Sequence, residues 1–218
     1  DAENFPKPWN NTSQQFQSAM VIMDPYTGKV LAMAGGVGEK NANLILNRAT
    51  DTLRAPGSSI KPLSVYGPAI EYGLITPSTL VNDAPRDEVD MSQDYWYPTN
   101  LPNQYSGIID IAEAVRASKN TVAAQVLDKL GIEASYNFLR NKLGITSLVG
   151  DDYNYAPLAL GELTNGVSVL EMAQAYCPFV NAGIFTEART YTRVTDSEGN
   201  LILDNQASTH VAMKSSTA

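Results

Sequence analysis

"RAPGSSIKP" at residues 54–62 brings a serine and a lysine together at the start of a predicted helix. Pro56-Gly57 predicts a turn, and residues 58–72 continue in a helical pattern. Positions three apart are neighbours on a helix, so Ser58 and Lys61 are expected on one face. A serine hydroxyl becomes an effective nucleophile when a base takes its proton, and a lysine with a lowered pKa can be that base.

The Ser-x-x-Lys spacing is a weak signal by itself. It occurs once in the chain, a frequency that average serine and lysine usage supplies by chance. The alternative is structural, with Ser58 as the N-cap of the helix and Lys61 as a solvated residue in its first turn. Both interpretations stay open until a second motif is considered.

The composition narrows the classes of function. The 218 residues are 44% hydrophobic and 17% charged, which is typical of one globular domain with a substantial core. A net charge of −8 without a lysine or arginine run argues against a nucleic acid partner. His210 is the one histidine and Cys177 the one cysteine, so a Ser-His-Asp triad or a multi-histidine or cysteine metal site is not expected. Cys177 lies in an apolar helical stretch and is predicted to pack in the core.

The chain predicts a lead-in followed by one domain. Residues 1–16 are polar and proline-rich, and residues 17–218 form the predicted domain. Two apolar runs within 18–34 flank Asp-Pro-Tyr-Thr-Gly, which predicts a β-hairpin. Nearly every position of both runs is apolar, so we expect this hairpin to be buried on both faces. Strand alternation returns at 190–204 and predicts a second hairpin.

Helices dominate the middle of the chain, 110–183. Helical patterns end at glycines or polar turns. The predicted helices are 110–117, 120–130, 133–143 and 168–181. The order of strands, then helices, then strands predicts an α+β fold.

The segment 75–107 contains several prolines and is predicted to be a long irregular loop. It concentrates four aromatic residues, Tyr95, Trp96, Tyr97 and Tyr105. Such a loop is often a cleft wall, but the rings can equally pack the loop onto the domain. The sequence does not decide between the two.

The second candidate motif is Ser118-Lys119-Asn120, at the junction of two predicted helices. Ser118 can relay a proton from Lys61, and the Asn120 amide can both donate to and accept from a peptide bond. The alternative is that a serine or asparagine here caps the next helix. A competing match, Ser135-Tyr136-Asn137, falls inside a helical pattern and is assigned to structure.

Ser-x-x-Lys followed about sixty residues later by Ser-x-Asn is the active-site pattern of penicilloyl serine transferases. The flanking sequence is more specific than the motifs, and over residues 18–205 it resembles the transpeptidase domain of class A penicillin-binding proteins. Four segments carry the resemblance in the family's order: "MVIMDPYTGKVLAMAGG", "NRATDTLRAPGSSIKPLSVYGPAIEYG", "AEAVRASKNTVAAQVLDKLG" and "LALGELTNGVSVLEMAQAYCPFVNAGIF". The fold implied is that of penicillin-binding proteins and serine β-lactamases, an antiparallel sheet with a helical subdomain.

The resemblance implies a role for each motif residue. Ser58 would be the acylated nucleophile, Lys61 its base, Ser118 a proton relay and Asn120 a substrate-binding residue. The substrate would be the D-alanyl-D-alanine end of a peptidoglycan stem peptide, with β-lactams acylating Ser58 as its mimics. No cofactor or metal is implied.

The family also implies partners and a location. Its members carry an N-terminal membrane anchor and a glycosyltransferase domain, neither of which is in these 218 residues. The domain would therefore work at the outer face of the bacterial cytoplasmic membrane, anchored by a segment outside this chain.

One departure from the family concerns its third motif, Lys-Thr-Gly or Lys-Ser-Gly. Lys214-Ser215-Ser216 is the nearest string, but it lacks the glycine. The motif's strand binds the substrate carboxylate and supplies one oxyanion donor, and removing one such donor typically costs about 100- to 1,000-fold in rate. We therefore expect the C-terminal strands to be missing from this chain, and the isolated chain to be inactive.

Three readings of function remain from the sequence. The first is a cross-linking D,D-transpeptidase. The second is a serine β-lactamase, in which Glu162 would be the base for hydrolysis of the acyl-enzyme. The third is a β-lactam sensor or wall-binding module, which would keep the same serine and lysine without cross-linking.

Overall fold

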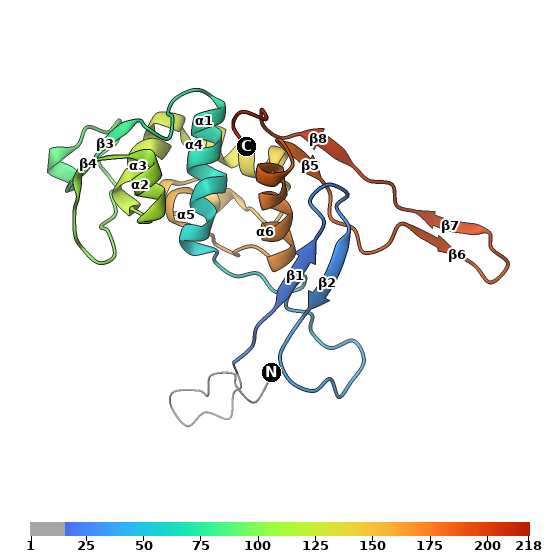
Figure 1. Cartoon of the computed structure of the whole chain (residues 1–218). Coiled ribbons are helices and arrows are strands. Elements are labelled where there is room, and N and C mark those ends of the chain that lie inside the picture. The colour runs from blue at the N-terminus through green and yellow to red at the C-terminus, as the bar shows by residue number, and fades with distance from the viewer. Residues whose placement is uncertain (1–15) are drawn as a thin grey trace.

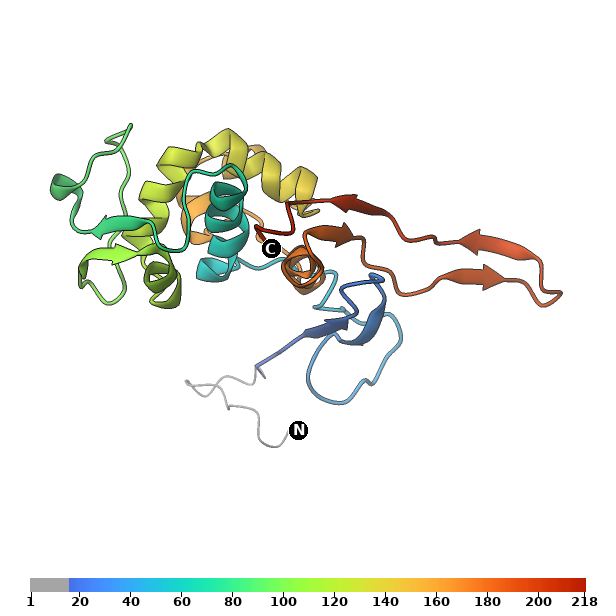
Figure 2. The same cartoon turned by 45° about the horizontal axis from the view of Figure 1, so that its top comes forward.

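The computed structural model describes residues 16–218, so almost all of the predicted lead-in at 1–16 lies outside the described residues. Helices gather on one side of the molecule, and short antiparallel strand pairs lie around them (Figures 1 and 2). This arrangement confirms the predicted α+β class. Among the described residues, no helix combines the length and the apolar character needed to cross a bilayer.

The helical run after the Pro-Gly turn is irregular. It begins as a 3-10 turn at Gly57–Ile60, continues as a π-helical turn at Pro62–Tyr66 and ends as α1, Gly67–Glu71. Proline lacks the amide proton of a regular helix, so Pro62 and Pro68 prevent a continuous α-helical ladder. The run nevertheless spans the predicted range and buries most of its middle in the core.

Five α-helices form most of the remaining helical part, with short 3-10 turns at Arg86–Glu88, Gly150–Asp152 and Cys177–Val180. The helices are α2 (Ile111–Arg116), α3 (Asn120–Leu130), α4 (Ile132–Asn137) with a π-helical turn at Phe138–Lys142, α5 (Tyr155–Leu160) and α6 (Val169–Tyr176). Their ends follow from local sequence. The Asp110 carboxylate caps α2 by accepting from Glu113 N at 2.8 Å, and Ser168 caps α6 together with Glu171. The sequence does not predict α5.

The strands form four antiparallel pairs. These are β1 (Met20–Met23) with β2 (Val30–Ala34), β3 (Leu80–Asp83) with β4 (Gly107–Asp110), β5 (Ile184–Thr186) with β8 (Thr209–Val211), and β6 (Arg193–Thr195) with β7 (Leu201–Asp204). The two predicted hairpins correspond to β1–β2 and β6–β7, and β6–β7 projects as an arm (Figures 1 and 2). The prediction of an irregular loop at 75–107 is wrong in part, because β3 pairs with β4 at its end.

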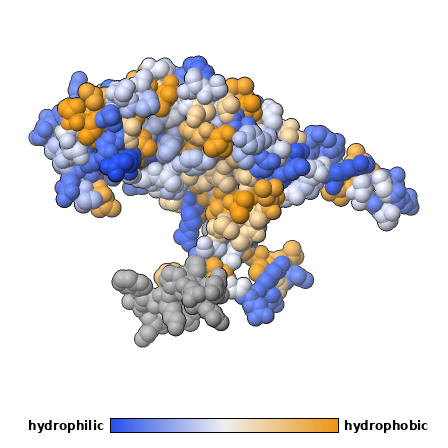
Figure 3. Space-filling model, in the orientation of Figure 1, coloured by the Kyte–Doolittle hydropathy of each residue, from blue (hydrophilic) through white to orange (hydrophobic). Residues whose placement is uncertain are grey.

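The expectation that the first hairpin is buried on both faces is also wrong. Met20, Ile22 and Leu31 are 55%, 47% and 65% exposed. Figure 3 shows apolar surface over this hairpin. Helix α6 packs against β1, and one bridge joins Lys29 to Arg189, so the pair has few covering partners among the described residues.

The core forms where α3, α4 and α5 surround the helical run 57–71. Leu63, Leu127 and Leu158 are completely buried there. A chain of buried hydroxyls crosses this core: Ser135 Oγ donates to Ser64 O at 2.6 Å, and Ser64 Oγ donates to Leu158 O at 2.6 Å. Ser135 is therefore a structural residue, as the sequence predicts for its competing motif.

We expect Ser135→Ala to lower the free energy of unfolding by about 1–3 kcal/mol, because it leaves the buried Ser64 carbonyl without that donor. The matched control is Ser147→Ala. The Ser147 hydroxyl is buried and makes no hydrogen bond with another described group, so its removal should be neutral or slightly stabilising. Denaturant unfolding of both variants measures the difference. Equal losses would show that the Ser135 hydrogen bond has no net effect.

Candidate active site

Ser58 lies on a tight turn that its neighbours hold in place. The Lys61 amide donates to Ser58 O, which closes the 3-10 turn, and side chains three apart eclipse one another in such a turn. Ser59 Oγ donates to Pro56 O at 2.6 Å. Ser58 is exposed and does not cap the helix, since the N-cap position is Pro56 with no side-chain cap bond. The N-cap interpretation of Ser58 is thus wrong.

The loop 161–166 supports this turn from one side. Gly57 N donates to Gly161 O at 3.3 Å. A Cβ at Gly161, which has a φ of +75°, would lie 2.2 Å from Gly57 O, so only glycine fits this approach. Glu162, the residue considered as a hydrolytic base, is exposed in the same loop.

Lys61 is the centre of the site. Its side chain is only 2% exposed, so it is not the solvated lysine of the structural alternative. Lys61 Nζ donates to Ser118 O at 2.8 Å, to Ser118 Oγ at 3.3 Å and to Asn120 Oδ1 at 2.6 Å. The structure therefore brings Lys61, Ser118 and Asn120 together. Within the described chain, no hydrogen bond joins Ser58 Oγ to Lys61 Nζ.

Burial changes the acid–base character of Lys61. Loss of hydration disfavours the charged ammonium and lowers the pKa of Lys61 from 10.5 to about 8. At pH 7 about one molecule in ten then has a neutral amine at this position. The arrangement can therefore supply a base near neutral pH on the same helical run as the exposed Ser58 hydroxyl.

Ser118 reaches Lys61 because α2 ends in an unusual way. Ser118 N donates to Val115 O at 3.0 Å and Lys119 N to Ala114 O at 2.9 Å, the two bonds of a Schellman motif. Ser118 has a φ of +53°, where glycine is the usual residue. The N-cap of α3 is Lys119, which forms no side-chain cap bond, so neither Ser118 nor Asn120 is the capping residue. Asn120 instead binds Lys61 through Oδ1 and donates from Nδ2 to Thr99 O at 2.9 Å.

Two buried polar residues contact this turn from behind, Asp83 and Asn100. The sequence does not identify either one. Both come from the 75–107 segment, and no spacing rule connects them to Ser118. Asp83 ends a strand that the local pattern does not predict.

The aromatic segment packs onto the domain. The Trp96 ring stacks on Tyr155 with centroids 6.0 Å apart, and Tyr97 OH donates to Ala84 O at 2.9 Å. These contacts favour the packing interpretation for both rings. Tyr95 contacts Tyr155 edge-on at 5.8 Å and remains 67% exposed.

The remaining reactive side chains lie apart from these contacts. His210 is exposed, stacks on Phe185 at 4.8 Å and makes no contact with Ser58. Cys177 is buried, as predicted, and burial raises the pKa of its thiol to about 11. Among residues 16–218, no cluster of three histidine, cysteine, aspartate or glutamate side chains is placed to hold a metal ion.

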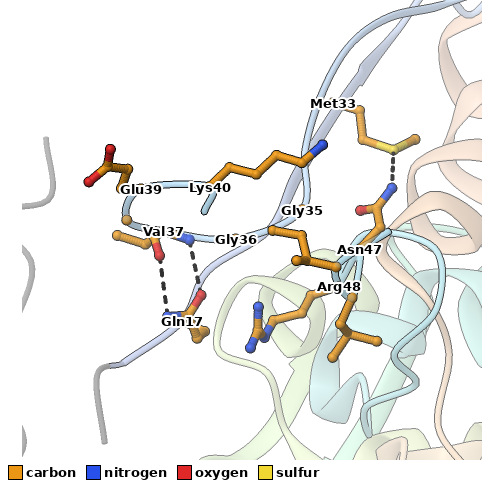
Figure 4. Close-up of a pocket in the computed structure, with 12 residues that line it drawn as sticks. Gln17, Met33, Gly35, Gly36, Val37, Glu39, Lys40, Asn47 and Arg48 are labelled. Carbon is orange, nitrogen blue, oxygen red and sulfur yellow. Dashed lines mark hydrogen bonds between the residues drawn. The ribbon is translucent and has the colours of Figure 1, made fainter. Parts of the chain in front are cut away.

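A cavity of about 380 Å³ lies between the end of β2 and the segment 35–48. Gln17 closes it by donating to Val37 O at 3.3 Å and accepting from Val37 N at 3.0 Å (Figure 4). None of the four candidate site residues lines it. The cavity is therefore separate from the candidate site.

Comparison with known proteins identifies relatives across almost the whole chain. The family model "Penicillin binding protein transpeptidase domain" matches residues 18–218. Penicillin-binding protein 1A of Clostridium botulinum (strain Langeland) is 38% identical over 200 residues, covering 88% of this chain and 24% of that protein. Penicillin-binding protein 4 of Bacillus subtilis is 37% identical over 187 residues, covering 85% of this chain and 28% of that protein. The chain thus spans about a quarter of the length of these curated relatives.

Solved structures agree with the sequence comparison. Penicillin-binding protein 1A from Haemophilus influenzae superposes with a TM-score of 0.71 at 31% identity, covering 88% of this chain and 27% of that one. The imipenem acyl-enzyme complex of penicillin-binding protein A from M. tuberculosis has a TM-score of 0.75 at 18% identity, covering 92% and 55%. At that identity the second match supports the fold alone. The predicted transpeptidase fold is confirmed.

Stability should depend on pH through Lys61. The pKa is lower in the folded protein (about 8) than the ordinary 10.5, so between these values the unfolded chain binds more protons and stability rises with pH. We expect wild type to gain up to about 3 kcal/mol of unfolding free energy relative to Lys61→Met between pH 8 and pH 10.5. Below pH 8 the difference should be constant. Denaturant unfolding across pH 6.5–10.5 tests this, and a flat difference throughout would contradict the lowered pKa.

Proposed function

The chain belongs to the penicillin-binding protein transpeptidase family, and we propose that it is the acyl-transfer domain of a D,D-transpeptidase that cross-links peptidoglycan through an acyl-serine intermediate on Ser58. The observation that carries the proposal is the buried Lys61. Its lowered pKa and its contacts with Ser118 and Asn120 assemble a base and polar groups, and Lys61 follows the exposed Ser58 by one 3-10 turn. The substrate proposed is the D-alanyl-D-alanine end of a stem peptide.

In the first step, Ser58 Oγ attacks the carbonyl carbon of the penultimate D-alanine as neutral Lys61 takes the hydroxyl proton. The resulting tetrahedral intermediate collapses by breaking its C–N bond. A proton passes from Lys61 by way of Ser118 Oγ, 3.3 Å away, to the leaving nitrogen, so that D-alanine departs as a neutral amine. The product is an ester between the stem peptide and Ser58.

In the second step, an amine from a neighbouring stem peptide attacks the ester carbonyl. The proton of the attacking amine returns through the same groups to Ser58 Oγ, which leaves the enzyme unchanged and the two peptides joined. Asn120 binds the donor peptide through its amide. The missing Ser58–Lys61 hydrogen bond is compatible with this scheme, because catalytic hydrogen bonds are often long or unmade without substrate.

The proposal includes partners and a location. β-Lactams acylate Ser58 as substrate mimics. A glycosyltransferase domain belongs to the same full-length protein, and a membrane segment outside this chain holds it at the outer face of the cytoplasmic membrane. These assignments rest on the family's architecture.

Ser58→Ala in the full-length protein should abolish covalent labelling by a fluorescent penicillin, because the acyl group loses its acceptor oxygen. Ser59→Ala is the matched control. Its hydroxyl is adjacent and exposed but is not the proposed nucleophile, so this variant should still be labelled stoichiometrically, at a rate that reports only the lost hydrogen bond to Pro56 O. Mass spectrometry of the labelled protein measures both. Labelling that persists in Ser58→Ala contradicts the mechanism.

The acylation rate should rise with pH and level off above an apparent pKa near 8, because the neutral Lys61 amine is the active form. Stopped-flow acylation of the full-length protein between pH 6 and 10 measures the profile. Lys61→Arg, which stays charged in this range, should be slow at every pH. A rate that is independent of pH in the wild type would exclude Lys61 as the base.

Three assays of the full-length protein distinguish a transpeptidase from a β-lactamase and from a β-lactam sensor. Sustained hydrolysis of a chromogenic cephalosporin would favour a β-lactamase that uses Glu162. Stoichiometric acylation with no joining of stem-peptide donors to acceptors would favour a sensor. Formation of cross-linked dimers supports the transpeptidase.

A further inference from the structure

The turn between α2 and α3 carries two of the proposed site residues. Two backbone hydrogen bonds close its α2 side, but its α3 side has no local side-chain cap. Ser118 sits at a positive φ of +53°, a strained conformation for a residue with a side chain. The first amides of a helix need acceptors, and the N-cap residue here, Lys119, supplies no side-chain acceptor. The acceptors for the first α3 amides must therefore come from residues elsewhere in the chain.

Asn100 supplies the missing acceptor. Its Oδ1 accepts from Asn120 N at 2.9 Å and from Thr121 N at 3.4 Å, so it caps α3 from a distant segment. Asn100 is itself buried and cannot rotate freely. Its Nδ2 donates to Asp83 Oδ1 at 2.6 Å and to Gln104 O at 3.0 Å, which fixes the amide with its oxygen toward α3.

Asp83 is the common partner of the residues around Asn120. Its carboxylate is completely buried at the end of β3. Lys119 Nζ lies 2.7 Å from Oδ2, and Thr121 Oγ1 donates to Oδ1 at 2.5 Å. Ser106 N also donates to Oδ2, at 2.8 Å. The carboxylate thus holds the residue on each side of Asn120 and, through Asn100, the Asn120 backbone.

The charge on Asp83 survives its burial. Loss of hydration by itself would raise the pKa of the Asp83 carboxyl. The Lys119 ammonium and the donors on Thr121, Asn100 and Ser106 outweigh that effect and keep the pKa below its ordinary value. A buried carboxylate with this many donors has one well-defined position.

We propose that Asp83 is a positioning residue for the proposed acyl transfer: it fixes the start of α3 so that the Asn120 side chain meets Lys61. Asp83 contacts neither Lys61 nor Ser58 by hydrogen bond. Its effect passes through Asn120, whose Oδ1 lies 2.6 Å from Lys61 Nζ. This inference rests on the function proposed above.

A double-mutant cycle in the full-length protein tests the inference. Asp83→Asn, Asn120→Ala and the double variant are compared for the rate of acylation by a fluorescent penicillin, per folded molecule. If Asp83 acts through Asn120, Asp83→Asn should slow acylation at least about tenfold in the wild type and have little further effect in Asn120→Ala. The inference would be overturned if the double variant lost the product of the two single fold-losses in rate, or if Asp83→Asn acylated at the wild-type rate.

Asp128→Asn is the matched control. The Asp128 carboxylate, on α3, also accepts three hydrogen bonds, from Ser92 N at 2.7 Å, Ser92 Oγ at 2.5 Å and Tyr155 OH at 2.7 Å. It does not contact the α2–α3 turn. This variant should lose stability but acylate at the wild-type rate, and a loss as large as that of Asp83→Asn would show a general structural effect and overturn the inference.

A milder substitution covers the case in which Asp83→Asn does not fold. Thr121→Val keeps the side-chain shape and removes one donor to Asp83, so it should slow acylation several-fold and again have little effect in Asn120→Ala. Independent effects of the two substitutions would overturn the inference. Labelling of Ser58→Ala distinguishes failure of the proposed function from failure of the Asp83 inference, because persistent labelling of Ser58→Ala rejects the proposed function itself.

Discussion

The structure depends on one buried ammonium and its three acceptors. Lys61 is buried from solvent, and its Nζ donates instead to three acceptors: Ser118 O at 2.8 Å, Ser118 Oγ at 3.3 Å and Asn120 Oδ1 at 2.6 Å. A buried charge without partners is costly, so these contacts tie the helical run 57–71 to the α2–α3 turn. The tie joins two segments about sixty residues apart in sequence, and the remaining elements hold each of them in place.

Each segment is supported by a feature that tolerates little change. The Ser58 turn rests against Gly161, where a Cβ would collide with the Gly57 carbonyl oxygen at 2.2 Å. The Ser118 turn rests against Asn100, which accepts from the first α3 amides, and against Asp83, which pairs with Lys119 Nζ and accepts from Thr121 Oγ1. Backbone contact fixes the first turn and buried polar contact fixes the second. The two supports come from different parts of the chain, so the geometry of Lys61 is set from both sides.

The sequence predicts the parts of this site that have fixed spacing. The Ser58–Lys61 pair and the Ser118–Asn120 pair are short motifs, and their flanking sequence resembles one family closely enough to predict that they meet. The supports have no such signal. Asp83 and Asn100 are ordinary polar residues in a proline-containing segment, and only the fold, in which β3 pairs with β4 and Asn100 bonds to Asp83, brings them to the Ser118 turn. The first hairpin shows the same limit, because its apolar pattern predicts burial on both faces while its exposure depends on which elements cover it.

The neighbours of Lys61 also explain how a lysine can have a pKa near neutrality in a site that contains a carboxylate. An unpaired carboxylate close to Lys61 would stabilise the ammonium and raise its pKa. Asp83 lies directly behind the turn, but it is paired with Lys119 at 2.7 Å and accepts further hydrogen bonds from neutral donors. The acceptors that Lys61 meets are all neutral, and burial lowers its pKa to about 8. Lys119, the middle residue of the Ser-x-Asn motif, therefore pairs with the buried carboxylate, and burial among neutral acceptors is what lowers the pKa of Lys61.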